Sequence, residues 1–226
     1  MNGQVIRDAR DAKGWTQAGL ATRLGVSQGY VALLEQGGRR PSDALRRRLA
    51  RVLQLPATSL PVSAGRGSTD GDALATEMAD LGYPGFAHLR RRRALRNPAA
   101  VLLDALASEA LDSRTAEALP WLVLAFPDLD WDWLLSQAKQ QDLQNRLGYV
   151  VSLARSVARL RGLDVAQDLE AREALLERSR LVREDVFGRG ALTEAERRWL
   201  RTHRPSAAAH WNLLSDLRVE HLSYVG

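Results

Sequence analysis

The stretch from Thr16 to Glu35, TQAGLATRLGVSQGYVALLE, most constrains how this chain can fold. Its apolar and small positions predict two short helices that meet at Gly25 and Val26. We expect Thr16 to cap the first helix and Ser27 the second, because a hydroxyl oxygen can accept a hydrogen bond from a free backbone N–H of the first turn. Glycine supplies the tight turn between the helices. The stretch therefore predicts a compact corner of two helices.

The flanking residues predict two more helices. One covers about residues 4–13 and ends at Gly14, in the position that glycine favours after a helix. The other begins after Pro41 and Ser42 and is closed by Pro56. Residues 1–56 are therefore predicted to form a four-helix domain.

Positive charge is concentrated in the same part of the chain. Residues 1–60 hold ten Lys and Arg against four Asp and Glu, whereas residues 61–226 hold 22 against 23. A helix, a tight turn and a second helix on a basic segment are typical of a helix-turn-helix motif, whose second helix enters the major groove of DNA. The sequence therefore predicts double-stranded DNA as a partner. Operators with two-fold symmetry are matched by proteins with two-fold symmetry, so a homodimer is expected.

Residues 4–55 resemble the Cro/CI-type helix-turn-helix regulators, also called xenobiotic-response-element regulators. The resemblance rests on Ile6-Arg7, Arg10, Trp15-Thr16-Gln17, Leu20-Ala21, Leu24-Gly25-Val26-Ser27, Val31, Leu34-Glu35, Gly37, Pro41, Leu45 and Leu49. It implies a DNA-binding transcriptional regulator. It also implies that Gln17 contacts a backbone phosphate, and that Arg10 and Glu35 form an internal salt bridge.

The predicted helix that Ser27 caps offers few groups that could read bases. The Gln28 amide, at its start, can bond adenine bidentately. Gly29 permits close approach of the DNA, and Tyr30 can contact a phosphate or a thymine methyl. Arg39 and Arg40 follow the helix and are expected to contact phosphates. The predicted DNA-binding residues are Thr16, Gln17, Ser27, Gln28, Gly29, Tyr30, Arg39 and Arg40. A helix-turn-helix used for protein contact is the alternative.

Residues 57–72, rich in Pro, Gly, Ser and Thr, are predicted to be a flexible linker. Residues 73–226 show helical periodicity and no convincing strand pattern, so we expect an all-α chain with a larger helical domain after the linker. Predicted helices there cover 99–111, 114–125, 131–138 after an Asp130 cap, 143–158, about 164–187, a segment beginning at Thr193 with a capping box to Glu196, and 206–217.

Several classes of function are not expected. The chain has no cysteine, and its four histidines show no metal-ligand spacing, so we expect no metal site, cofactor or catalytic site. Residues 1–10 lack a signal-peptide core and the apolar run 119–126 is too short to span a bilayer, so a cytoplasmic protein is expected. The basic run Arg90–Arg93 could contact phosphate, RNA or an acidic partner, or form a solvated helix face.

Two segments of the C-terminal part, 133–149 and 209–217, resemble helical regulators encoded beside AbiEii-type nucleotidyltransferase toxins. The resemblance implies an antitoxin that represses its own operon and holds a cognate toxin through its C-terminal domain. Asn145, Arg146, Trp211 and Asn212 are then the expected partner-binding residues.

Other interpretations of the C-terminal part stay open. Five tryptophans lie there, and they could form core, a partner surface or a small-molecule pocket. A pocket would make the chain a one-component, ligand-sensing regulator. An enzyme domain is the third possibility.

Overall fold

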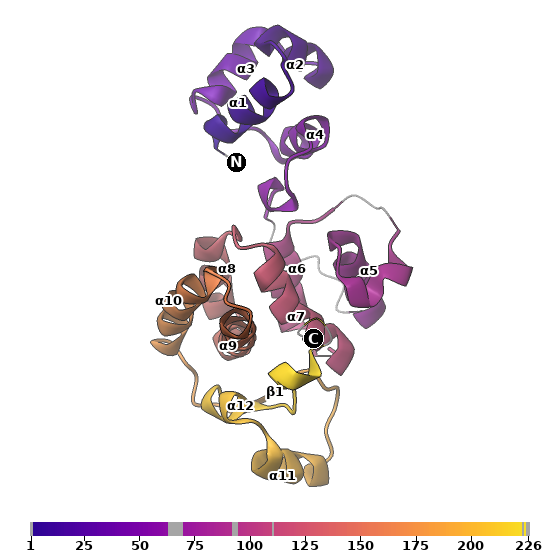
Figure 1. Ribbon diagram of the computed structural model, residues 1–226, viewed down its shortest axis with the longest axis vertical. Coiled ribbons are helices and arrows are strands. Elements are labelled where there is room, and N and C mark those ends of the chain that lie inside the picture. The colour runs from indigo at the N-terminus through magenta and orange to yellow at the C-terminus, as the bar shows by residue number, and fades with distance from the viewer. Residues whose placement is uncertain (1, 63–69, 92–94, 110, 223, 225–226) are drawn as a thin grey trace. The chain divides into compact units, whose positions relative to one another are not determined.

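The computed structural model describes residues 2–62, 70–91, 95–109, 111–222 and 224, which form two compact units, Met1–Ser63 and Ala64–Gly226 (Figure 1). The regular secondary structure of the described residues is almost wholly helical, which confirms the all-α prediction. None of the helices in these ranges has the length and apolar character needed to traverse a membrane.

The first unit contains the four predicted helices and a short 3-10 turn. Their bounds are α1 (Gly3–Ala12), α2 (Gln17–Leu24), α3 (Gln28–Glu35), α4 (Asp43–Leu53) and η1 (Ala57–Ser59). The predicted caps are confirmed, because Thr16 accepts a hydrogen bond from the N–H of Gly19 and Ser27 accepts one from Tyr30. Gly25 takes the left-handed conformation, φ 63°, that the turn requires.

The helices of the first unit enclose one apolar core. Its buried side chains come from all four helices: Ile6, Leu20, Ala21, Leu24, Val31, Leu34, Leu49 and Leu53. Gly3 lets the start of α1 lie against the end of α3, since a Cβ there would be 2.4 Å from the carbonyl oxygen of Leu34. This packing fixes the orientation of α3 within the unit.

The predicted linker, 57–72, contains ordered structure at both ends. Ala57, in η1, and Pro61 are buried, so the first unit continues beyond residue 56. Helix α5 already begins at Gly71, and residues 63–69 lie outside the described residues.

The second unit is built from short helices around one long one. Its elements are α5 (Gly71–Leu81), η2 (Pro84–Leu89), α6 (Pro98–Ala107), α7 (Ser113–Ala125), α8 (Trp131–Gln140), α9 (Gln144–Leu160), α10 (Val165–Glu177), β1 (Asp185–Val186), α11 (Glu194–His203), α12 (Ser206–His210), β2 (Leu213–Leu214) and η3 (Val219–His221). The Asp130 cap of α8 and the Thr193–Glu196 capping box of α11 are confirmed.

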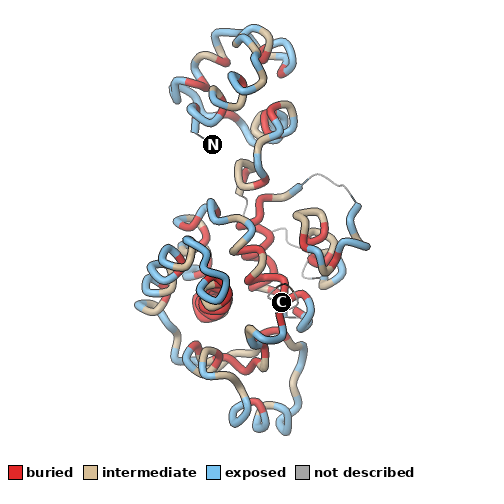
Figure 2. Tube along the Cα trace, viewed as in Figure 1, coloured by how far each residue is buried: buried red, intermediate tan, exposed pale blue. Residues whose placement is uncertain are grey.

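Helix α9 is the centre of this unit. Twelve of its seventeen residues are buried, and α7, α8, α10 and α12 all contact it (Figure 2). At Gly148 the indole of Trp211 lies directly on the helix, since a Cβ there would be 2.4 Å from the ring. The hydroxyl of Tyr149 donates a hydrogen bond to the carbonyl of Leu217.

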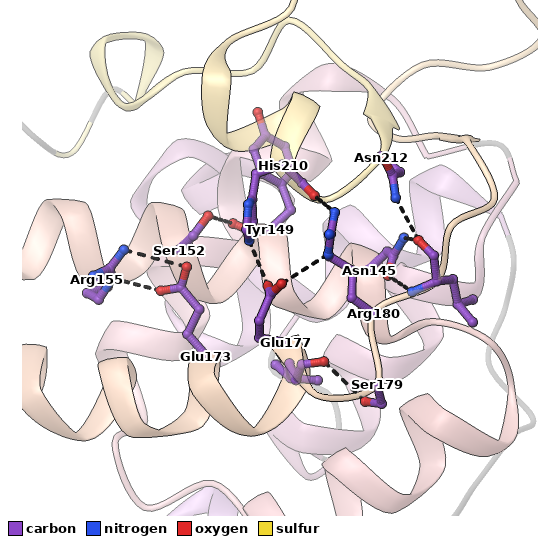
Figure 3. A network of polar contacts seen from close by, with 12 residues as sticks. Asn145, Tyr149, Ser152, Arg155, Glu173, Glu177, Ser179, Arg180, His210 and Asn212 are labelled. Atoms are coloured by element: carbon purple, nitrogen blue, oxygen red, sulfur yellow. Dashed lines mark hydrogen bonds and ion pairs between the residues drawn. The ribbon is translucent and has the colours of Figure 1, made fainter.

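The predicted helix over 99–111 stops at Ala107, and two other predicted helices end much earlier than expected. The predicted helix over 164–187 stops at Glu177, because Asn145 binds the backbone of Leu181: it accepts from the N–H and donates to the carbonyl, each at 2.8 Å (Figure 3). The predicted helix over 206–217 stops at His210, and Asn212 takes a left-handed φ of 53°. The segments that follow, β1 and β2, pair in parallel. Long-range hydrogen bonds therefore replace helical ones in both places.

The arginine run also differs from the expected helix face. Arg90 follows η2, and its Nε donates to the carbonyl of Ala79 at 3.1 Å. The backbone N–H of Arg91 donates to Asp80 at 2.8 Å, in a loop. Arg92 and Arg93 lie outside the described residues.

Candidate DNA-binding surface

The outer face of α3 presents the groups predicted to read DNA. Ser27, Gln28 and Gly29 are exposed at the start of the helix, and Tyr30 is half-buried beside them. Further along, Leu33 keeps 43% of its surface exposed although it is apolar. The polar, DNA-accessible part of this face is therefore its first turn, which is the part of a recognition helix that reaches base edges.

Gly29 has no packing role within the described structure. A Cβ built there meets no described atom within 4 Å. Glycine in a helix costs up to about 1 kcal/mol relative to alanine. The remaining benefit of glycine at position 29 is the space that it leaves on the solvent side of α3. That space would let a DNA backbone or base approach the helix closely.

A buried ion pair ties the first three helices together beneath this face. The Glu35 carboxylate has no exposed surface, and Arg10 donates to it from Nε at 2.6 Å and from Nη2 at 3.1 Å. The Nε2 of Gln17 donates to the same carboxylate at 3.0 Å, and Arg7 lies 3.6 Å away. The implied salt bridge between Arg10 and Glu35 is confirmed.

The electrostatics of this pair hold Glu35 ionised. Burial raises the pKa of the Glu35 carboxyl, but the hydrogen bonds from Arg10 and Gln17 and the charges of Arg10 and Arg7 outweigh burial and lower the pKa below its ordinary value. The Gln17 amide, expected to contact phosphate, therefore also has a structural role. At the start of its helix, α2, the Thr16 side chain accepts a hydrogen bond from the backbone N–H of Gly19.

Arg39 and Arg40 lie exposed in the loop after α3. The backbone N–H of Arg39 donates to the carbonyl of Leu33 at 3.3 Å, which ties the loop to the helix. Within the described ranges, no carboxylate lies within ion-pair distance of either guanidinium. Both side chains are thus accessible from solvent, and their contact with phosphates stays a prediction.

One basic group near α3 was missed by the sequence analysis. Arg48, on α4, lies against the turn between α2 and α3, with its Nη1 3.6 Å from the Cβ position of Gly25. It borders a shallow groove of about 610 Å³ that Ser27 and Tyr30 line at the start of α3 and Ser42 lines at the start of α4. The Arg46–Arg48 run was the available signal, but the sequence did not place it beside the turn.

Of the four residues expected to contact a partner, two are buried, which corrects the prediction for them, and the other two, Arg146 and Asn212, are half-buried and bound within the unit. Asn145 and Trp211 are buried, and Asn212 donates to the carbonyl of Leu181 at 2.7 Å. Arg146 pairs with Asp185, Nε to Oδ2, at 2.6 Å. These residues hold α9 to the segments around β1 and β2, so their chemistry is structural.

Comparisons with known proteins cover the first unit. A family model described as helix-turn-helix matches residues 6–60. The "Uncharacterized HTH-type transcriptional regulator YazB" of Bacillus subtilis (strain 168) is 41% identical over 58 residues, which are 26% of this chain and 84% of that protein. No solved structure matches the chain. The geometry of α2 and α3 and these matches together show that the chain belongs, through its first unit, to the helix-turn-helix family of transcriptional regulators.

Proposed function

We propose that the protein is a sequence-specific repressor that binds a two-fold operator as a homodimer. The observation that carries this proposal is the exposed first turn of α3, with Gln28 and Gly29 at its tip and the Arg10–Glu35 pair fixing the helix from below. Arg39, Arg40 and Arg48 supply the positive charge that phosphate contacts need. No catalytic step is assigned to this surface.

The experiment uses DNA from upstream of the protein's own gene. A reporter driven by that DNA should fall when the protein is supplied, and Gln28→Ala should relieve the repression. Gln36→Ala is the matched control, because Gln36 is exposed at the opposite end of the same helix. Equal repression by all three proteins contradicts reading by Gln28, and an unchanged or raised reporter contradicts repression.

The homodimer is tested by sedimentation of the full chain with and without a duplex holding two half-sites. A two-fold complex sediments with two protein chains per duplex. Saturation at one chain per duplex contradicts the dimer while leaving DNA binding by α3 intact.

We propose further that the second unit acts as an antitoxin, as the resemblance of segments 133–149 and 209–217 implies. Because Asn145 and Trp211 are buried, a toxin must contact other side chains of this unit. The neighbouring gene provides the test. Its product alone should arrest growth, and co-expression of this protein should restore growth and give a complex that co-purifies. A harmless neighbouring gene contradicts the antitoxin role.

A further inference from the structure

Helix α11 exposes an aromatic pair that the core does not use. Trp199 keeps 51% of its surface exposed, although the side chain is large and apolar. Its ring is stacked on that of His203, with centroids 4.4 Å apart and planes inclined by 5°. The Nδ1 of His203 lies 2.8 Å from the carbonyl of Trp199, so the pair is held by its own helix. A supported, exposed ring face of this kind is a stacking platform.

Positive charge accompanies this platform. Arg198 is exposed beside Trp199, and Nη2 of Arg218 donates to the carbonyl of His203 at 3.0 Å. Among the described residues, no carboxylate lies within ion-pair distance of Arg198 or Arg218. Arg201 differs, because it is neutralised by Glu184 at 2.9 Å.

The surrounding sequence is basic within an otherwise acidic part of the chain. Residues 178–204 hold eight arginines against four carboxylates, whereas residues 61–226 as a whole carry one more negative charge than positive. Four of these arginines pair with carboxylates, namely Arg180, Arg189, Arg201 and Arg204. The positive charge that remains beside an exposed aromatic ring favours an anionic polymer with planar bases. An acidic protein surface would use the charge but would leave the stacking face without a specific role.

We propose that the α11 surface, defined as Arg198, Trp199, His203 and Arg218, binds an unpaired nucleic-acid strand. A base stacks on Trp199, and the flanking phosphates contact the two arginines. In a duplex the base faces are covered by their neighbours, so this surface is distinct in ligand from the α3 face, which reads duplex DNA. The inference goes beyond the proposed repressor function and does not depend on it.

The test measures anisotropy of a labelled thymidine strand of about 20 nucleotides, longer than the roughly 4–16 nucleotides that single-strand sites cover. The full chain is compared with Trp199→Ala, and each protein is also titrated with an abasic strand of the same length. Loss of one stacked base predicts at least about fivefold weaker binding of the thymidine strand. Binding of the abasic strand should not change, because it offers no base to stack.

The arginines are tested separately by salt dependence. The double variant Arg198→Gln with Arg218→Gln should weaken binding of both the thymidine strand and the abasic strand. It should also reduce the slope of log affinity against log salt by about 1.4, because two contacts to a single strand are lost. Arg161→Gln, exposed at the end of α9, is the control for a change of charge outside the basic segment. It should leave the slope close to that of the parent.

Folding and duplex binding are checked in the same proteins. Because Trp199 is half exposed, Trp199→Ala should keep the parent's circular dichroism and melting temperature, and its affinity for duplex operator should match the parent. The proposal is overturned if the parent does not bind the thymidine strand. It is also overturned if Trp199→Ala binds that strand like the parent, or loses the same affinity for both strands.

Discussion

The guanidinium of Arg10 and the carboxylate of Glu35 face each other in a bidentate pair across 25 residues of sequence, with Nε–Oε1 at 2.6 Å. Both side chains are nearly shielded from solvent. Arg10 also donates from Nη1 to the carbonyl of Trp15 at 2.7 Å. The pair therefore joins α1, the start of α2 and the end of α3, and it sets the base on which the DNA-binding face rests.

Removing one partner of this pair should destabilise the first unit strongly. Glu35→Gln removes the buried countercharge of Arg10 and leaves it only the exposed carboxylate of Asp11, and a broken buried pair costs about 3–5 kcal/mol. Urea unfolding followed by circular dichroism measures the free energy of unfolding of this unit. Asp8→Asn, on the exposed side of α1, is the control and should stay within about 0.5 kcal/mol of the parent. If Glu35→Gln changed the free energy of unfolding as little as the control does, the pair would contribute little to stability.

The same carboxylate predicts an acid-sensitive first unit. The pKa of Glu35 in the folded protein is lowered below its ordinary value of 4.5, so its contribution to stability is fully present above pH 4.5. That contribution is lost as the pH falls through the lower, folded pKa, because protonation removes the charge that Arg10 binds. The free energy of unfolding of the parent should thus fall more steeply below pH 4.5 than that of Glu35→Gln. Parallel curves would contradict this assignment.

Gly29→Ala should separate stability from DNA binding. A methyl group at this position meets no described atom within 4 Å, so the helix should gain up to about 1 kcal/mol of stability. The methyl group points into the space that DNA would occupy, so affinity for operator should fall. Thermal unfolding and operator titration of the same protein check both effects. Unchanged affinity in a stabilised variant would show that the DNA does not approach α3 at Gly29.

In the second unit, Gly148→Ala should be strongly destabilising. The new Cβ would lie 2.4 Å from the Trp211 ring, and overpacking of a core typically costs about 1–3 kcal/mol. Gly190→Ala is the control, because its Cβ would meet nothing within 4 Å. Melting temperatures of the two variants compare them directly. Similar values would mean that Trp211 can move away from α9 at little cost.

Local signals predicted the first unit well. The hydroxyls of Thr16 and Ser27 each precede an apolar helical pattern, and both form the predicted caps. Gly25 adopts the left-handed turn, and the family resemblance correctly paired Arg10 with Glu35. Each of these features depends on residues close in sequence or on a widely shared motif.

The second unit was predicted less well, because its decisive contacts are long-range. The side chain of Asn145 binds the backbone of Leu181, 36 residues away, and β1 pairs with β2 across two helices, α11 and α12. Helical periodicity alone extends α10 and α12 past these points. The resemblance to antitoxin regulators predicted Asn145 and Trp211 as partner contacts, but both are buried.

The central claim is that the first turn of α3 reads DNA, while the loop after it holds the phosphates. Salt-dependent anisotropy with the operator duplex and a scrambled duplex tests both parts. Gln28→Ala should reduce the difference in binding free energy between the two duplexes by about 1–3 kcal/mol. The slope of log affinity against log salt should change little. The double variant Arg39→Ala with Arg40→Ala should weaken binding to both duplexes equally and reduce that slope by about 1.8. If both variants bind both duplexes like the parent, this surface does not contact DNA as described.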